Sequence, residues 1–208
     1  MTDEKTPAID PALFGRVKGI LLQPRLEWAI IAAEQTTVKG LFNRYAVILA
    51  AIGPVAKLVN DLVIGGDGPI KALLLAACYY GVNLLLAYIL GIVIDGLAHN
   101  FGSQKNTVQS MKVAVYAMTP YWVVGALCLL SVDLGSTLAV LSGFYGIYLM
   151  CLGMGALKGT PQGKTVGYAA AVTVIWMILA CVVMGMIGSV IVAFSVMEQG
   201  ASLIANAL

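Results

Sequence analysis

The sequence predicts an all-α fold, a polytopic membrane bundle of five transmembrane helices preceded by short amphipathic interfacial helices. Hydrophobic residues make up 60% of the chain and charged residues 11%, whereas soluble domains have roughly half and a quarter. Two apolar runs, residues 112–132 and 134–157, are separated only by Asp133. Each run is long enough to cross the roughly 30 Å hydrocarbon layer as a helix. Together they predict a helical hairpin through a bilayer.

The first 36 residues precede the predicted spans. Residues 1–10 are polar, and we expect a disordered cytoplasmic tail there. Residues 11–36 predict two short helices that meet at Pro24, with apolar side chains at helical spacing opposite charged ones. Such helices lie in the headgroup layer or pack on the cytoplasmic end of the bundle, and the sequence leaves both open. Their candidate contacts for protein partners or lipids are Arg16, Lys18, Arg25 and Trp28.

Residues 37–197 predict the transmembrane domain, and residues 198–208 an external tail. We expect the five spans at residues 41–64, 71–98, 112–132, 134–157 and 166–197. Gly53 and Pro54 predict a kink in the first span. The last span is longer than a bilayer requires, so it must tilt, protrude or bend. Small residues spaced four apart predict that the fourth span is central. These are the pairs Ala139/Gly143, Ser142/Gly146 and Gly155/Gly159.

The placement of lysine and arginine predicts the orientation. Ten of the twelve basic residues lie before or at the start of the first span or flank the second and fourth interhelical loops. The sequence therefore predicts a multi-pass protein of the bacterial cytoplasmic (plasma) membrane, with its N-terminus in the cytoplasm and its C-terminus outside.

Polar side chains inside the spans are the default functional candidates, because they are costly in lipid. Those singled out as a possible intramembrane polar site are Asn83, Asp95, Tyr116, Tyr145 and Tyr148. Asn83 either forms a hydrogen bond between helices, with Thr119, Thr173 or Ser142 as partner, or contacts a ligand. Asp95 and His99 share a helix face. The pair is either a hydrated helix end or a site for a proton or a cation. Tyr116 fits an aromatic belt, whereas Tyr145 and Tyr148 line a cavity or pack the bundle. Lys57 and Asp61 are expected to pair at i,i+4.

Catalytic constellations are not evident. His99 is the single histidine, and no nucleophile–base–orienter set, HExxH, P-loop or GxSxG context occurs. We therefore predict a protein that is not an enzyme, with no catalytic residues, no metal site and no cofactor. The net charge of +2 is too small to suggest nucleic-acid binding.

Two segments resemble the signature core of the Yip-domain membrane proteins, named for interaction with Ypt/Rab GTPases. The first carries Tyr-x-x-Thr-Pro (Tyr116, Thr119, Pro120), and the second carries Tyr-x-x-Tyr-Leu (Tyr145, Tyr148, Leu149). Further matching positions are Gly153, Pro161, Lys164, Gly167 and Tyr168. The segment Pro24 to Glu34 is similar to bacterial members, and the resemblance covers about residues 12–195.

The resemblance implies five spans and a cytoplasmic N-terminus. Eukaryotic members act in membrane traffic with Rab proteins, whereas bacterial members have no Rab partner. Many members carry a proline near the turn between spans three and four, where this chain has Val132 and Asp133. This departure concerns the shape of that turn and not the bundle.

Three functions are compatible with these features. The first is a non-enzymatic membrane scaffold or adaptor that organises protein partners or lipids through residues 11–36. The second is a transporter or channel for a small solute or an ion, which would require a homo-oligomer because five spans give no inverted repeat. The third is a lipid-binding membrane protein with a groove that opens to the side.

Overall fold

A computed structural model describes residues 11–64 and 68–207, and in these residues the chain is helical with short connections. Within this part, five helical segments are long and apolar enough to cross a membrane: Val38–Ile64, Pro69–Phe101, Thr107–Leu129, Val132–Lys158 and Gln162–Ser189. The protein is an all-α polytopic membrane bundle, as the sequence predicts. The predicted tail, residues 1–10, lies outside the described residues.

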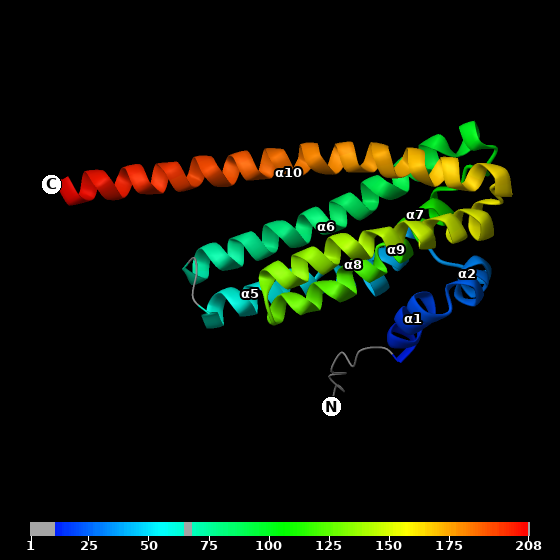
Figure 1. Cartoon of the computed structure of the whole chain (residues 1–208), viewed down its shortest axis with the longest axis horizontal. Coiled ribbons are helices and arrows are strands. Elements are labelled where there is room, and N and C mark those ends of the chain that lie inside the picture. Colours follow the sequence, from blue (N-terminus) through cyan, green and yellow to red (C-terminus); the bar gives the residue numbers. More distant parts are fainter. Residues whose placement is uncertain (1–10, 65–67, 208) are drawn as a thin grey trace, which may run out of the picture.

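Two short helices precede the bundle, α1 (Pro11–Leu22) and α2 (Pro24–Ala33). Pro24 opens the second of them, where its fixed φ suits a first helical turn and its missing N–H costs nothing. Figure 1 shows both helices near the same end of the bundle as the last turns of α9 (Val132–Lys158). The side chains of Ile20, Trp28 and Ile31 are buried against the bundle.

The first span is an interrupted helix that begins at a side-chain cap. The hydroxyl of Thr37 accepts a hydrogen bond from the Gly40 N–H at 3.1 Å, which satisfies a free donor of the first turn. Its segments are α3 (Val38–Leu41), η1 (Phe42–Ala46), α4 (Val47–Ala50) and α5 (Ile52–Ile64). The break at Ala51 precedes Pro54, whose ring clashes with the carbonyl four residues earlier. The predicted kink therefore lies within one turn of its expected position.

The second and third spans meet at a short polar turn. The second consists of α6 (Pro69–Leu97) and η2 (Ala98–Phe101), and Gly102 ends it at φ 68°. The third consists of α7 (Thr107–Ala117), α8 (Thr119–Val124) and η3 (Gly125–Leu129). Asn106 caps α7, because its side chain accepts a hydrogen bond from the Gln109 N–H at 3.2 Å. The third span therefore begins before residue 112, and Lys112 lies inside the helix.

Helix α9 is the central helix of the fold. It packs against α2, α7, α8, η3 and α10 (Gln162–Ala207). A Cβ at Gly146 would approach the Ala117 carbonyl oxygen within 2.8 Å, so one predicted small-residue pair marks a close contact between helices. Gly159 has another role, since it ends α9 in the left-handed conformation at φ 60°.

Helix α10 is continuous through Gly185, Gly188 and the segment 198–207, which was expected to be a separate tail. Its 46 residues correspond to roughly 69 Å at 1.5 Å per residue, more than twice the hydrocarbon thickness. Figure 1 shows its C-terminal part extending beyond the other helices. Its first turns carry its buried residues, Tyr168, Ala169 and Val172.

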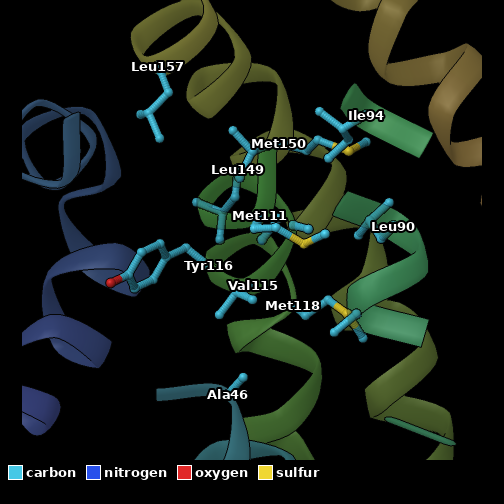
Figure 2. Packing of buried hydrophobic residues seen from close by; sticks show 14 of the residues in the cluster. Ala46, Leu90, Ile94, Met111, Val115, Tyr116, Met118, Leu149, Met150 and Leu157 are labelled. Carbon is cyan, nitrogen blue, oxygen red and sulfur yellow. The ribbon is translucent and has the colours of Figure 1, made fainter. Parts of the chain in front are cut away.

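The core lies where α6, α7 and α9 meet. Figure 2 shows Leu90, Met111, Leu149 and Met150 between these helices, with Tyr116 pointing away from them toward the N-terminal helices. Unbranched methionine side chains fill irregular gaps between helices. The core therefore continues from the bundle into α1 and α2.

Candidate functional site at the basic end of the bundle

The candidate site lies at one end of the bundle, called here the basic end. It consists of α1, α2 and the turns 102–106 and 159–161, together with the helix ends beside them. Three charged residues are buried here, Asp95, Lys112 and Lys158. Charges in such surroundings need partners, and the structure gives partners to all three.

Asp95 accepts hydrogen bonds from the start of α7, on the other side of the polar turn. The Asn106 N–H donates to its Oδ1 at 3.0 Å, and the hydroxyl of Thr107 donates to its Oδ2 at 2.9 Å. The hydroxyl of Ser110 donates to Oδ1 at 2.9 Å and accepts a hydrogen bond from Lys158 Nζ at 2.5 Å. Lys158 Nζ also lies 3.4 Å from Asp95 Oδ1. The carboxylate thus ties the end of α6 to the start of α7 and the end of α9.

Lys112 holds the C-terminal end of α2. Its Nζ donates hydrogen bonds to the carbonyl oxygens of Ile31 at 2.8 Å and Glu34 at 2.6 Å. The last carbonyl groups of a helix lack partners within the helix and carry partial negative charge. The buried ammonium group of Lys112, in the third span, therefore caps the C-terminal end of α2.

Tyr116 connects α2 with the first span. Its ring makes edge contacts with Trp28, at 6.1 Å between centroids, and with Tyr45, at 4.6 Å. The guanidinium carbon of Arg16 lies 6.0 Å from the centre of the same ring, within reach of a cation–π attraction. The hydroxyl groups of Tyr45 and Thr119 form a hydrogen bond at 2.9 Å. Tyr116 is a packing centre rather than a free polar group.

Arg16 is also engaged within the N-terminal helices. It forms ion pairs with Glu27 at 2.6 Å and Glu34 at 2.9 Å. These pairs join α1 to α2 and leave little of the guanidinium group for an external partner. Arg16 was predicted as a contact for partners or lipids, and in this fold its guanidinium group joins the two helices.

Trp28 inserts into a notch on α9. A Cβ at Gly153 would lie 2.8 Å from the indole ring, and only 1% of Trp28 is exposed. The hydroxyl of Tyr145 donates a hydrogen bond to the Leu21 carbonyl at 2.8 Å and so holds the end of α1. Trp28, predicted among the partner contacts, is therefore buried between α2 and α9 in this fold.

The outward side of α1 and α2 combines charge with apolar surface. Lys18 and Arg25 are exposed, as the prediction of partner or lipid contacts requires. Large hydrophobic side chains are exposed on the same two helices: Phe14, Leu22, Leu26 and Ile30. We call the helix pair with this outward face the platform. A face of this composition suits the boundary between headgroups and acyl chains.

A second feature lies deeper, in the middle of the bundle. A cavity of about 370 Å³ is lined by α6, α7, α8, α9 and α10. Asn83 and Trp176 are among its lining residues. The Asn83 side-chain amide donates to the Tyr79 carbonyl of its own helix at 2.9 Å, so this bond does not join two helices as one interpretation expected. Tyr148 is 42% exposed and stacks obliquely near Tyr145, at 5.6 Å between ring centres.

Two expectations for pairs have different outcomes. Lys57 and Asp61 form an ion pair at 2.5 Å, which confirms the expected i,i+4 pair. His99 is exposed, whereas Asp95 is buried among the partners described above. In the residues that the structure covers, no three histidine, cysteine, aspartate or glutamate side chains cluster closely enough to hold a metal ion.

The sequence matches the Yip1 domain over residues 18–199. This match covers most of the chain. The protein belongs to the Yip1 domain family. Its relatives include the inner membrane protein YohC from two strains of Escherichia coli, K12 and O6:H1. Each is 26% identical over an alignment of 165 residues, and the alignment covers 74% of this chain and 85% of the relative. No solved structure matches the chain significantly.

The residues that resemble the Yip1 signature perform packing roles in this structure. Tyr116 and Thr119 connect the first span, the third span and α2. Tyr145 holds the end of α1, and Gly153 receives Trp28 of α2. Tyr168 donates a hydrogen bond to the Ile94 carbonyl and stacks on Phe101 at 4.8 Å between ring centres. The signature therefore describes how the helices of this Yip1 domain dock on each other.

Sequence reasoning missed the buried lysines of this Yip1 domain. Lys112 and Lys158 were counted only as charges that flank loops, although both are almost completely buried. A signal for Lys112 exists in the sequence, because Asn106 is a good cap. A helix starting at Thr107 places Lys112 more than one turn inside it. No comparable signal marks Lys158, whose partners Asp95 and Ser110 are distant in the sequence.

Proposed function

We propose that this Yip1 domain is a non-enzymatic membrane scaffold that engages protein partners through the platform formed by α1 and α2. The observation that carries the proposal is the way the platform is held. Lys112 caps α2 and Trp28 is inserted against Gly153. A partner or lipid bound to a fixed surface does not have to supply the ordering entropy of that surface. The exposed basic and apolar side chains of the platform are the proposed contact residues.

We further propose that the basic end faces the cytoplasm and the C-terminus lies outside, in the inner membrane of a bacterium. Lysine and arginine placement supports this orientation through the positive-inside rule. The relative YohC is named as an inner membrane protein. A reporter fused after Leu208 should be active only outside the cytoplasm, and cytoplasmic activity would contradict the topology.

The polar residues within the spans give little support to the alternative of a transporter. Asp95 is enclosed by Thr107, Ser110 and Lys158, so its carboxylate is committed to fixed partners. Within the cavity, the hydroxyls of Ser142 and Thr173 donate to carbonyl groups of their own helices. A solute pathway needs polar groups that exchange partners with the solute.

Photocrosslinking in intact cells tests the scaffold proposal. A photoreactive amino acid at Phe14 or Leu26, both exposed on the platform, should form discrete adducts with partner proteins. The matched control places the same amino acid at Val63, which is exposed at the opposite end of the bundle. Lys18→Glu with Arg25→Glu should remove the platform adducts, whereas Lys39→Glu should preserve them. Adducts that persist in the double variant, or that form equally at Val63, would overturn the proposal.

A further inference from the structure

We propose that the cavity in the middle of the bundle is a binding site for one acyl chain of a bilayer phospholipid, inserted sideways between α9 and α10. This site is separate from the platform, and neither depends on the other. The depth of the cavity supports this assignment. Asn83 lines it and is fourteen residues from either end of α6 (Pro69–Leu97), or about 21 Å by helical rise. The cavity therefore lies at the level of the acyl chains.

The lining disfavours water and ions as occupants. A buried water needs two to four polar partners, and the polar side chains here are few. Asn83 donates to Tyr79, Ser142 to Ala139, and Thr173 to Ala169, in each case to a backbone carbonyl of its own helix. The Trp176 indole N–H is committed to the Leu86 carbonyl at 3.0 Å. Apart from the hydroxyl of Tyr121, the surface that remains is formed by aliphatic, thioether and aromatic groups.

The opening of the cavity points to the bilayer. Four of its lining side chains are also exposed on the surface of the bundle: Tyr121 from α8, Val140 and Phe144 from α9, and Met177 from α10. In a membrane, these side chains touch lipid. An acyl chain can therefore enter from the bilayer without crossing water, and a polar solute cannot reach this opening.

The size suits a single chain. A volume of about 370 Å³ lies at the lower end of the range of roughly 300–1,000 Å³ for small-molecule sites. The energetic gain is packing rather than the hydrophobic effect, because the chain leaves one apolar medium for another. Lining atoms next to a void lose their dispersion contacts, and a hydrocarbon chain restores them.

The buried floor of the cavity distinguishes a bound chain from ordinary surrounding lipid. Ala117 and Met118 line the cavity but are 5% and 7% exposed, so bulk lipid does not reach them. Gly143 also lines the cavity, and a Cβ at this position would meet no atom within 4 Å. A large side chain there should fill the space without a clash against the backbone.

The experiment uses the full chain in vesicles of phosphatidylethanolamine and phosphatidylglycerol that contain a phospholipid with a diazirine in one acyl chain. After illumination, mass spectrometry should find label on Ala117 or Met118. Gly143→Phe should reduce this label to the level found without illumination. Gly155→Phe is the control on the same helix, because a Cβ at Gly155 also meets nothing and Gly155 does not line the cavity; it should retain the label.

A second variant guards against misfolding. Thr173→Phe fills the cavity from α10 and should reduce the label as Gly143→Phe does, provided that both variants elute as the wild type does in gel filtration. The absence of label on Ala117 and Met118 in the wild type would overturn the proposal. So would a label that persists in both variants or disappears equally in Gly155→Phe. If a second copy of the chain occupies the cavity, the floor stays unlabelled and Gly143→Phe changes the oligomeric state, which also overturns it.

Discussion

Lys158, the last residue of α9, forms an ion pair at 3.4 Å with Asp95 of α6, and the hydroxyl of Ser110 on α7 bonds to both. The Lys158 side chain is fully buried and that of Asp95 is 11% exposed. The ion pair and the Ser110 hydroxyl thus join three spanning segments, α6, α7 and α9. A buried pair of this kind adds little net stability, but each member makes the other tolerable, since a single buried charge is costly.

The first prediction concerns this pair. Lys158→Met leaves the Asp95 carboxylate without its cation, and Asp95→Asn leaves the Lys158 ammonium without its anion. Each change should lower the free energy of unfolding by about 3–5 kcal/mol. The double variant should be less destabilised than the sum of the two. Unfolding of the purified protein in mixed detergent micelles with increasing SDS measures these differences.

The Lys57–Asp61 pair provides the control for this cycle. It joins residues of one helix, and both side chains are partly exposed, at 30% and 19%. Lys57→Met should therefore cost only about 0.3–0.5 kcal/mol, as i,i+4 pairs do. Equal costs at Lys57 and Lys158 would contradict the role assigned to the buried pair.

The second prediction concerns the anchor of the platform. Lys112→Met removes the cation that caps the carbonyl groups of Ile31 and Glu34. Hydrogen bonds to charged groups contribute about 1.5–3 kcal/mol each, so α2 should open far more often than in the wild type. Hydrogen exchange in residues 24–33 should accelerate while exchange in α9 stays slow. Lys39→Met, which changes an exposed lysine, should leave both rates unchanged.

The spans could be predicted from the sequence because lipid imposes one rule on all of them. Every backbone polar group in the hydrocarbon layer must bond internally, so long apolar runs must be helices. The Lys57–Asp61 pair was equally accessible, because helical periodicity alone places the two residues on one face. Such features depend on neighbours within a single helix, and the sequence contains all the information about them.

The candidate site was harder to predict because its contacts join distant segments. Lys112 bonds to residues about eighty positions earlier, and Lys158 to Asp95 across α7. Counting charges places lysines at helix ends but cannot show that an end is buried. The place of Trp28 was ambiguous for the same reason, since an aromatic residue on a short amphipathic helix suits both a lipid contact and a core. The notch at Gly153 decides between them.

The third prediction concerns Asn83. Its side-chain amide bonds to the Tyr79 carbonyl of the same helix, so Asn83→Leu removes a hydrogen bond within one helix and adds apolar surface to an apolar cavity. The free energy of unfolding should change by less than about 1 kcal/mol, within the range of single polar contacts in membrane bundles. SDS unfolding measures the change. A decrease in the free energy of unfolding as large as that of Lys158→Met would contradict this prediction and favour a hydrogen bond from Asn83 between helices.

The fourth prediction concerns the notch that receives Trp28. In Gly153→Ala, the new Cβ would lie 2.8 Å from Cη2 and 2.9 Å from Cζ2 of the indole ring. The ring cannot retreat easily, because Trp28 is buried and its other contacts include the edge of Tyr116. Overpacking of this kind costs about 1–3 kcal/mol, and the platform should exchange amide hydrogens faster.

Two further variants separate this steric effect from a general effect of alanine. Gly155→Ala places its Cβ in open space, so it should be neutral or stabilise α9 by up to about 1 kcal/mol through helix propensity. Trp28→Phe, combined with Gly153→Ala, replaces the indole by a smaller ring and should recover part of the loss. Because the clash involves these two residues alone, the pair must show a coupling energy in a double-mutant cycle. Additive costs would mean that the indole does not occupy the notch, and the platform would then need another anchor beside Lys112.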